Sequence, residues 1–458
     1  MEFKDFGLHA DIERALTAKR YTTPTPIQSQ AIPVLLQGRD LCGIAQTGTG
    51  KTAAFSLPSL HHLMSNPKAR PPRGCRMLVL SPTRELAAQI AQNCRDYARF
   101  SKMVVTTVFG GVPINRQIRD LAQGVDILVA TPGRLLDLID QRALRLDDVE
   151  IFVLDEADQM MDMGFIHSLR RVAKILPKQR QNLFFSATMP KEIAGLAQQF
   201  LNDAVTVSVA PQATTAEKIN QRLTYVDQKE KQALLHHLVA TEDIDRALVF
   251  TRTKHGADRV VRHLAGAGIK AFAIHGNKSQ AQRTAALQAF RSGQVKLLVA
   301  TDIAARGIDV SGVSHVINFE IPNVPEQYVH RIGRTARAGA EGVAFSFVAP
   351  DEKNYMRDIE RVTRTRVEAV KLPDGFSEMV RNLPKPEAPP RNTGGKGRDP
   401  QRQREDAQRS RPAGKGRGPN GGQRREGSAP GAEGERKRFF RPRSGGVGAH
   451  KAAVKRVG

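Results

Sequence analysis

Eight consecutive residues, Ala45 to Thr52, have the types and spacing of a phosphate-binding loop. The glycines at 48 and 50 allow backbone N–H groups to turn toward an anion, and the N-terminus of a following helix adds free donors. Lys51 can reach the β- and γ-phosphates of a nucleotide, and the Thr52 hydroxyl can bind Mg²⁺. Ala45 stands where the usual pattern has glycine, so spacing alone also fits an ordinary turn before a helix. The residues expected to bind the nucleotide here are Ala45, Gln46, Thr47, Gly48, Thr49, Gly50, Lys51 and Thr52.

A second group of chemically capable residues is the acidic run 155–158, Asp-Glu-Ala-Asp, which follows the apolar run 151–154. A buried strand that ends in acids is where a nucleotide-binding sheet holds its Mg²⁺ partner. Asp155 would hold the ion, partly through water, because Mg²⁺ keeps much of its hydration shell. Glu156 would orient and deprotonate the attacking water. Alone, the four residues also fit a solvated acidic loop.

The elements that must position these groups alternate along the chain as short β-rich runs and helical stretches, the latter including 84–99 and 280–291. Several runs are apolar at every position, as strands covered on both faces are. The runs expected to be strands are 41–44, 77–80, 104–109, 127–130, 151–154, 183–185, 205–209, 223–226, 247–250, 271–274, 296–300, 316–319 and 343–348. The alternation predicts an α/β fold with parallel sheets covered by helices on both faces.

The alternating pattern occurs twice at roughly equal length, which predicts two similar domains, 1–208 and 219–372, joined by a linker at 209–218. The phosphate-binding loop occurs in the first half alone. Two similar domains with one such loop suggest a nucleotide held in a cleft between them.

The composition of the 458-residue chain points to a polyanionic partner, because the formal net charge is +24 and the pI is about 10.3. Nucleic acid is the first candidate. The chain has no Trp, so extended stacking on bases is excluded as the main binding mode. Its three cysteines, Cys42, Cys75 and Cys94, lack metal-ligand spacing and fit small core residues in a reducing cytosol. No signal peptide or membrane-spanning run is expected, and the predicted location is cytoplasmic.

The composition changes from about Leu383. Residues 385–458 contain 20 Lys or Arg against 7 Asp or Glu, a net charge of +13, and aliphatic residues are almost absent. Such a segment cannot bury enough apolar surface to fold alone. We therefore expect a disordered, basic, Gly/Arg-rich tail at 373–458.

The sequence resembles a DEAD-box ATP-dependent RNA helicase of superfamily 2. The resemblance covers about residues 1–372, and the Ala-x-Thr-Gly-x-Gly-Lys-Thr form at 45–52 is the family's own version of the loop. The ordered motifs that carry the resemblance are 21–28, 45–52, 82–87, 110–111, 131–134, 155–158, 186–188, 249–253, 300–309 and 330–339. Membership implies two RecA-like domains in tandem, with ATP and Mg²⁺ as cofactors.

The resemblance also implies roles for single residues. Gln28, with Tyr21 and the upstream aromatic Phe3, would read adenine, and Gly307 and Asp309 would complete the nucleotide site, with Asp309 on the ribose. Arg334 and Arg337 would neutralise charge on the γ-phosphate, although a basic cluster that binds RNA is the alternative for this pair. The residues expected to contact RNA are Pro82, Thr83, Arg84, Gly111, Thr131, Pro132, Gly133, Arg134, Arg252 and Thr301. Ser186, Thr188 and His330 would couple ATP hydrolysis to strand separation.

Three residues depart from the family pattern. Arg20 replaces the usual Gly at the start of the 21–28 motif, Tyr21 replaces the usual Phe, and Ala336 replaces Gly in the last motif. Tyr can stack as Phe does and Ala is small, so activity is still expected. The compact core and short basic tail resemble the bacterial RhlE type.

The expected function is that of an RNA-dependent ATPase that locally opens short RNA duplexes and remodels RNA or RNA–protein complexes. Its partner would be single-stranded or short duplex RNA, with little sequence preference because the backbone is gripped. Ribosomal precursor particles and RNA-decay enzymes are further candidate partners, and ribosome biogenesis, RNA decay and cold adaptation remain open as pathways. The alternatives are a non-enzymatic RNA chaperone or annealing protein and a DNA translocase of the same superfamily.

Overall fold

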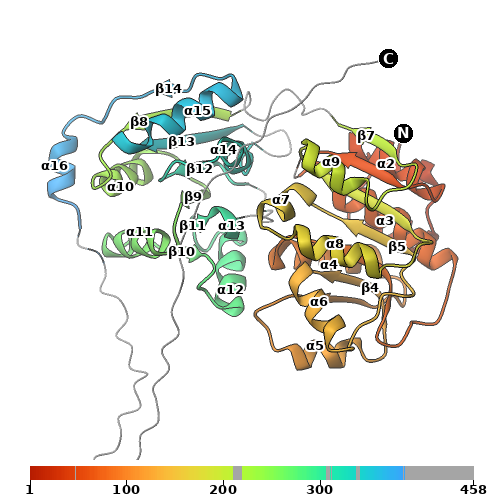
Figure 1. Ribbon diagram of the computed structural model, residues 1–458. Coiled ribbons are helices and arrows are strands. Elements are labelled where there is room, and N and C mark those ends of the chain that lie inside the picture. The colour runs from red at the N-terminus through yellow and green to blue at the C-terminus, as the bar shows by residue number, and fades with distance from the viewer. Residues whose placement is uncertain are drawn as a thin grey trace, which may run out of the picture. The chain divides into compact units, whose positions relative to one another are not determined.

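The computed structural model describes residues 1–46, 48–209, 219–305, 310, 312–336, 341–384 and 386. These residues form two domains, each built on a seven-stranded sheet in which every assigned strand pair is parallel. The predicted α/β class with two parallel-sheet domains is confirmed (Figure 1). The expected linker at 209–218 lies, apart from residue 209, outside the described residues, as does all of the chain from 387 onward.

The first domain holds strands β1 to β7 in the spatial order β3-β4-β2-β5-β6-β1-β7. Its strands are β1 (Leu41–Ile44), β2 (Cys75–Leu80), β3 (Val105–Val108), β4 (Val125–Ala130), β5 (Ile151–Leu154), β6 (Gln181–Ser186) and β7 (Val205–Ser208). Its helices are η1 (Phe3–Phe6), α1 (Ala10–Ala18), α2 (Pro26–Leu36), α3 (Lys51–Ser65), α4 (Arg84–Tyr97), α5 (Ile114–Leu121), α6 (Pro132–Asp140), α7 (Ala157–Asp162), α8 (Ile166–Ile175) and α9 (Lys191–Ala197).

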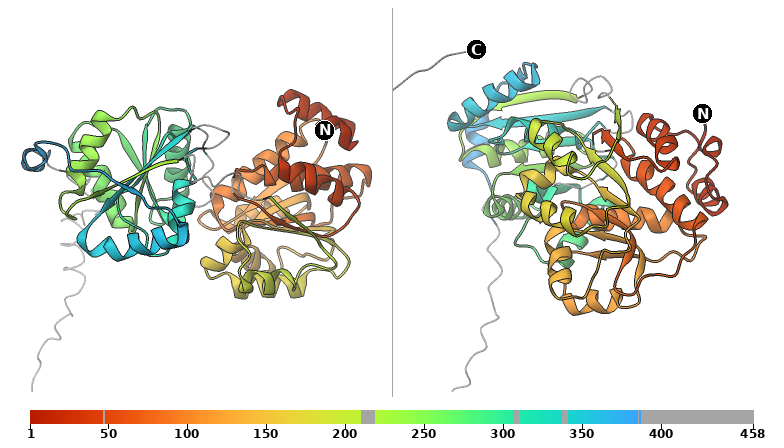
Figure 2. Two further views of the ribbon diagram at one scale, coloured as in Figure 1. Left: turned by 90° about the horizontal axis from the view of Figure 1, so that it is seen from above. Right: turned by 45° about the vertical axis from the view of Figure 1, so that its right-hand side comes forward.

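The central strands of this sheet are apolar throughout because both faces are covered. β2, β4 and β5 are buried at every position. Residues of α1 to α4 pack with one face of the sheet, and residues of α6 to α9 pack with the other. Figure 2 shows these two helical layers on either side of the strands. Burial on both faces is the physical reason for the near-continuous apolar runs in the sequence.

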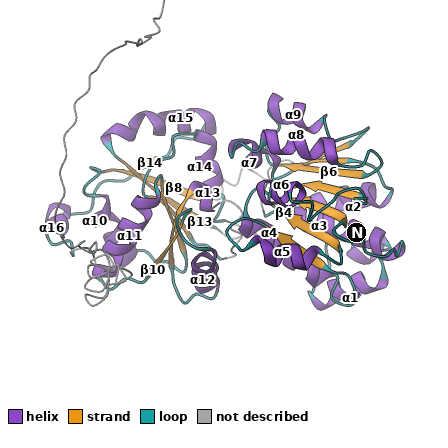
Figure 3. Cartoon of the chain, turned by 60° about the horizontal axis from the view of Figure 1, so that its bottom comes forward, coloured by secondary structure: helices purple, strands orange, loops and turns teal. Residues whose placement is uncertain are grey.

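The second domain has the spatial strand order β10-β11-β9-β12-β13-β8-β14. Its strands are β8 (Ile219–Tyr225), β9 (Ala247–Thr251), β10 (Ala271–Ile274), β11 (Leu297–Thr301), β12 (His315–Asn318), β13 (Gly342–Val348) and β14 (Glu368–Ala369). Its helices are α10 (Lys231–Thr241), α11 (Lys254–Gly266), α12 (Gln280–Arg291), α13 (Asp302–Ala305), α14 (Pro325–Ile332), η2 (Pro350–Glu352), α15 (Lys353–Thr363) and α16 (Phe376–Arg381). Figure 3 shows the strands of this domain between their helices.

The ordered part of the second domain differs from the sequence expectation at its C-terminal end. Helix α16 lies beyond residue 372, inside the segment expected to be a disordered tail. Phe376 is buried in the same apolar cluster as residues of α10 and α11, and Met379 and Leu383 pack against that cluster. The short run of apolar residues after 372 therefore belongs to the domain, because one buried aromatic ring anchors the helix.

Two smaller expectations concern the cysteines and the membrane. Cys42, Cys75 and Cys94 are free and buried, which confirms their expected place in the core. Within the described part of the chain, no helix is both long and apolar enough to span a membrane.

Candidate active site

Three neighbouring strands of the first sheet end at the candidate site. β6 pairs with β5 on one side and with β1 on the other. The phosphate-binding loop follows β1, the acidic run follows β5, and Ser186 ends β6. Because the strands are parallel, all three segments emerge at the same edge of the sheet, where ligands bind in open α/β folds.

The loop itself turns through two glycines with positive φ, Gly48 at 87° and Gly50 at 95°. A Cβ atom on Gly50 would lie 2.4 Å from the Gln28 amide nitrogen, so only glycine fits there. Helix α3 begins directly afterwards at Lys51, and the Thr49 hydroxyl donates to Gln46 O at 2.8 Å. The loop therefore places backbone donors and a helix N-terminus together, as phosphate binding requires.

A cavity of about 540 Å³ lies elsewhere, beside α16, whereas a cavity of about 230 Å³ opens at this loop. The smaller cavity carries the candidate chemistry, because predicted site residues from three separate segments, 21–28, 45–52 and 155–158, converge on it. Those residues are Tyr21, Gln28, Gly48, Gly50, Lys51, Thr52, Asp155 and Glu156. Five further residues also line it, namely Ala53, Leu86, Gln89, Asn93 and Tyr97, and none of them was expected from the sequence to bind the nucleotide.

Gln28 is fixed by its place in the first turn of α2. Its Oε1 accepts from Thr25 N at 2.9 Å, which forms a capping box with Thr25, and its Nε2 donates to Gly50 O at 3.1 Å. The side chain is 4% exposed. An amide has two N–H donors and two acceptor lone pairs, so these two bonds leave capacity for a base edge. Gln28, the candidate adenine-reading residue, is thus hydrogen-bonded directly to the phosphate-binding loop.

The aromatic residues expected around the base lie close together. Phe3 is buried and its ring centroid is 6.1 Å from that of Tyr21, which is 39% exposed. The Phe3 N–H donates to Thr22 O at 3.1 Å. The N-terminal segment is therefore folded back against the residues that precede α2.

Lys51 and Asp155 form the charged floor of the cavity. The Lys51 Nζ donates to Ala45 O at 3.1 Å and lies 3.9 Å from Asp155 Oδ1. Burial raises the pKa of the Asp155 carboxyl, against the opposing effect of Lys51. Among the described residues, Asp155 Oδ1 has no hydrogen-bond partner. A buried carboxylate oxygen without a hydrogen-bond partner is suited to bind a divalent cation, whose positive charge would compensate the charge of the carboxylate.

Glu156 follows in a left-handed backbone conformation, with φ 57° and ψ 53°, at the N-cap of α7. Left-handed conformations cost free energy in residues other than glycine, and such strain clusters at functional sites. The side chain is buried at 2% exposed and lines the cavity. The strained turn directs consecutive acids, Asp155 and Glu156, into one pocket.

Asp158 is a residue that was not assigned a role from the sequence. Its Oδ2 accepts from Ala187 N at 3.1 Å, Thr188 N at 3.0 Å and Thr188 Oγ1 at 3.1 Å. Ser186, at the end of β6, is fully buried. The signal that could have found Asp158 is its position as the last residue of the acidic run. It joins that run to the segment expected to couple hydrolysis to strand separation.

The RNA candidates of the first domain lie at the same edge of the sheet, in the segments that follow β2, β3 and β4. Arg84 begins α4, and a Cβ atom on Gly111 would lie 1.9 Å from its Nη1 atom. Arg134, in α6, donates to Val112 O at 3.1 Å and to Gln117 Oε1 at 2.8 Å. Both guanidinium groups therefore pack on the turn that holds Gly111. The remaining members of this group, Pro82, Thr83, Thr131, Pro132 and Gly133, lie at the starts of α4 and α6.

In the second domain the described candidates lie after β9, at the last residue of β11, and after β12. Thr301 pairs with Thr251, so Arg252 emerges beside Thr301. His330 lies in α14, and Arg334 Nε donates to His330 O at 3.1 Å. Four expected site residues lie outside the described part of the chain: Thr47, Gly307, Asp309 and Arg337.

Two of the three departures from the family pattern lie at left-handed positions. Arg20 has φ 56° and Ala336 has φ 54°, at the two sites where glycine is usual. A residue with a Cβ atom adopts this region at a cost of about 1–2 kcal/mol. Both left-handed turns therefore occur in this chain, although neither position holds the glycine that is usual there.

Comparisons with known proteins agree with this geometry. Residues 25–196 match the model of the DEAD/DEAH box helicase family, and residues 230–339 match that of the helicase conserved C-terminal domain. The chain is 43% identical over 383 residues to the ATP-dependent RNA helicase CshA of Listeria monocytogenes, covering 83% of this chain and 73% of that one. It is 31% identical to S. cerevisiae Dbp5 bound to RNA and ADP BeF3, with a TM-score of 0.71 and coverage of 83% and 98%. For Mss116p bound to ssRNA and AMP-PNP the identity is 26%, the TM-score 0.74 and the coverage 83% and 80%. Together the matched motifs, the two domains and the site establish that the chain belongs to the DEAD/DEAH box helicase family.

Proposed function

We propose that this protein is an RNA-dependent ATPase that locally unwinds short RNA duplexes. The observation that carries the proposal is the cavity on which Gln28, Lys51, Asp155 and Glu156 converge. These side chains supply a base-reading amide, a phosphate-binding cation, a metal-binding carboxylate and a base for water. The names of the relatives, an ATP-dependent RNA helicase and a protein bound to RNA and ADP BeF3, support the same function.

The residues of the first domain would divide the work as follows. Gln28, with Tyr21 and Phe3, reads adenine, and the loop from Ala45 to Thr52 binds the phosphates. A bound Mg²⁺, held by Asp155 and Thr52, would supply positive charge to the phosphate oxygens. Glu156 orients the attacking water and takes its proton. Because the cavity walls are fixed by backbone contacts, these groups need little rearrangement when the nucleotide binds.

Residues of the second domain would complete catalysis. We propose that Gly307 and Asp309 contact the nucleotide and that Arg334 and Arg337 neutralise charge that develops on the γ-phosphate. An arginine in this role contributes about 10³–10⁵ in rate. His330 precedes Arg334 by four residues in the same segment, which suits a part in coupling.

The RNA would be bound through its backbone at the ends of the strands adjoining the ATP site. Arg84, Gly111 and Arg134, with their neighbours at the starts of α4 and α6, form the proposed surface in the first domain. Arg252 and Thr301 form it in the second. Because backbone contacts carry little sequence information, little sequence preference is expected.

Three finer assignments belong to the proposal as well. The protein would act in the cytoplasm and be of the RhlE type. Its partners would be ribosomal precursor particles or RNA-decay enzymes, in addition to RNA itself. Sequencing of RNA crosslinked to the protein in cells would separate these pathways.

The proposal is tested by measuring ATP hydrolysis with and without single-stranded RNA, together with strand release from a short RNA duplex. Stimulation by RNA and ATP-dependent strand release are expected from the full chain, and Lys51→Ala is the negative control. ATP-independent strand annealing with no hydrolysis would support a non-enzymatic RNA chaperone instead. Equal competition by RNA and DNA of one sequence would favour a DNA translocase of the same superfamily.

A further inference from the structure

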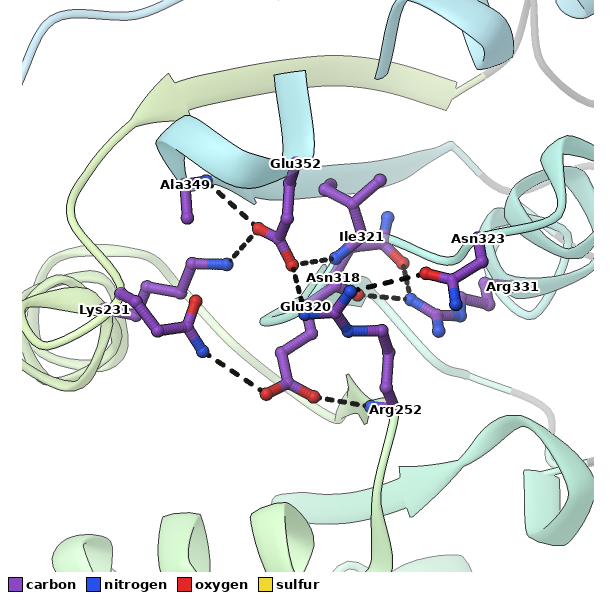
Figure 4. A network of polar contacts seen from close by, with 10 residues as sticks. Lys231, Arg252, Asn318, Glu320, Ile321, Asn323, Arg331, Ala349 and Glu352 are labelled. Carbon is purple, nitrogen blue, oxygen red and sulfur yellow. Dashed lines mark hydrogen bonds and ion pairs between the residues drawn. The ribbon is translucent and has the colours of Figure 1, made fainter. Parts of the chain in front are cut away.

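We propose that Glu352, a buried residue outside every family motif, is a positioning residue that holds Arg252 in place for an RNA phosphate. The proposal rests on the proposed function, because it specifies how one of its RNA contacts is built. Figure 4 shows the residues involved, which come from separate elements at one edge of the second sheet.

Glu352 is a fully buried carboxylate with four donors around it. Its Oε1 accepts from Ile321 N at 3.1 Å, and its Oε2 accepts from Ala349 N at 3.0 Å. Lys231 Nζ also contacts Oε2, and Arg252 Nη2 lies 3.4 Å from Oε1. One side chain thus joins the N-terminus of α10 to the segments that follow β9, β12 and β13 (Figure 4).

Stability alone does not explain the buried Lys231–Glu352 pair. Both side chains are fully buried. Burial lowers the pKa of Lys231, which shows the cost of holding its charge there. A well-packed apolar pair often stabilises a core as well as a buried ion pair does. What an apolar pair would lack is a fixed carboxylate directed at Arg252.

Arg252 is held on its inner side and exposed on the other. Its backbone N–H donates to Glu320 Oε2 at 2.6 Å, and its Nη1 donates to Asn323 Oδ1 at 3.3 Å. The side chain remains 28% exposed. A guanidinium has five N–H donors; one is donated to Asn323, and Nη2 lies at ion-pair distance from Glu352. The rest of the fork is therefore pre-oriented, which reduces the entropy lost when a phosphate binds.

The position of Arg252 agrees with this role. β9 pairs with β11 so that Thr251 lies opposite Thr301, another proposed RNA contact. Arg252 thus emerges at the proposed RNA surface, while the backbone around it is fixed through Glu320. The Glu320 carbonyl in turn accepts from Arg331 Nη1 at 2.6 Å, and Arg331 Nη2 donates to Asp302 Oδ2 at 2.7 Å.

The test measures ATP hydrolysis by the full chain as a function of single-stranded poly(U) concentration. Arg252→Ala should raise the half-saturating RNA concentration about fivefold to tenfold, as removal of one charge-assisted phosphate interaction does. Glu352→Gln should raise it by a similar factor while the rate at saturating RNA changes less than about twofold. In the Arg252→Ala background, Glu352→Gln should add nothing, because the residue that it positions is gone.

Lys231→Met is the matched control. It removes the other partner of the buried pair but leaves the Glu352 side chain beside Arg252, so the half-saturating RNA concentration of the folded variant should stay unchanged. Its free energy of unfolding should fall strongly, because a buried carboxylate loses its partner. The salt dependence gives a second readout, since neutralising one fewer phosphate on a single strand lowers the slope of log affinity against log salt by about 0.7. Glu352→Gln and Arg252→Ala should both lower the slope, and Lys231→Met should not.

The outcomes separate the two proposals. A wild-type chain without RNA-stimulated hydrolysis overturns the proposed function itself. Wild-type RNA dependence in Arg252→Ala, or equal and additive losses in all three variants, overturns the positioning role alone. If Glu352→Gln does not fold, Glu352→Asp replaces it in the test. The shorter side chain keeps a negative charge beside Lys231 but moves the carboxylate away from Arg252. Failure of both to fold, with Arg252→Ala folded, would assign Glu352 to stability and overturn the proposal.

Discussion

At the scale of single residues, Glu156 shows how the fold prepares chemistry. The Glu156 side chain is buried and its backbone is in the left-handed conformation. It follows Asp155, whose carboxylate oxygen is suited to bind a cation. Glu156→Gln should keep ATP and RNA binding and lower turnover by about 10²–10⁴-fold, the usual contribution of a general base. Steady-state hydrolysis and RNA binding in the presence of ATP would be measured together. Near-normal hydrolysis by the purified variant would remove Glu156 from this role.

A second residue-scale prediction concerns Ser186 and Thr188. The Thr188 hydroxyl donates to Asp158, so these residues link the acidic run to the end of β6. Replacing both with Ala should reduce RNA strand release far more than ATP hydrolysis, because the catalytic acids stay in place. Loss of the Thr188 bond should cost about 1 kcal/mol of stability. Thr188→Ser, which keeps the hydroxyl, is the control, and a fall in strand release merely proportional to hydrolysis would contradict coupling.

At the scale of elements, a buried arginine joins two strands to a helix in the first domain. Arg76 in β2 is 2% exposed, and its Nε donates to Glu150 Oε1 at 2.6 Å just before β5 begins. The same guanidinium donates to Leu63 O and Asn66 O at the end of α3. Glu150 also contacts His62 and Lys68, each at 3.1 Å. This cluster fastens α3 to the sheet at the edge away from the cavity.

The cluster predicts a pH-dependent contribution to stability. Partial burial alone would raise the pKa of Glu150, but Arg76, His62 and Lys68 lower it to about 2. Because the folded-state pKa is depressed, the stabilisation is complete above the unfolded value of about 4.3 and is lost as pH falls toward 2. Glu150→Gln should lower the free energy of unfolding at pH 7 by about 2 kcal/mol, after allowance for solvent screening of a partly exposed group.

The chain offers a readout for this domain alone, because Cys42, Cys75 and Cys94 are all buried within it. Their reaction with dithiodipyridine, which proceeds at acid pH, would report unfolding of the first domain in urea. Asp140→Asn, which breaks an exposed pair with Arg171, is the control and should change nothing measurable. A difference between Glu150→Gln and wild type that persists undiminished at pH 2 would contradict the assignment.

At the scale of the whole molecule, charge is unevenly distributed along the chain. Residues 385–458 carry a net +13 of the total +24, and apart from residue 386 they lie outside the described part. We predict that this segment tethers RNA and takes no part in hydrolysis. Its removal should lower RNA affinity and flatten the salt dependence by about 0.7 for each phosphate that the segment neutralises. Hydrolysis at saturating RNA should change little, since every predicted site residue is retained.

Control variants separate charge from stacking in this segment. Phe439 and Phe440 lie between basic residues, and stacking on bases would contribute about 1–3 kcal/mol for each ring. Replacing both with Ala should weaken RNA binding without changing the salt slope. An unchanged slope after truncation would show that the segment does not bind RNA, and absence of hydrolysis at saturating RNA would place it in the catalytic unit.

The sequence alone determined the two-domain α/β architecture. A strand that is buried on both faces is apolar at nearly every position, and such a run can be recognised in the sequence without knowing which elements cover it. β1, β5 and β10 begin and end where expected, at 41–44, 151–154 and 271–274. The segments of the nucleotide site were also visible, since each is a short run of special residue types. Helix α16 and the two-residue strand β14 were missed, because their few apolar residues acquire meaning once they pack on distant elements.

Only the tertiary structure decided which side chains meet. Gln28 donates to Gly50 O, Asp158 holds the Thr188 segment, and Arg252 contacts Glu352, although each pair is far apart along the chain. These contacts follow from the spatial order of the strands, which brings their carboxyl ends to one edge in an order unlike that of the sequence. Left-handed turns at Arg20, Glu156 and Ala336 were hidden for a related reason. Residue type alone disfavours that conformation, and only the surrounding fold imposes it.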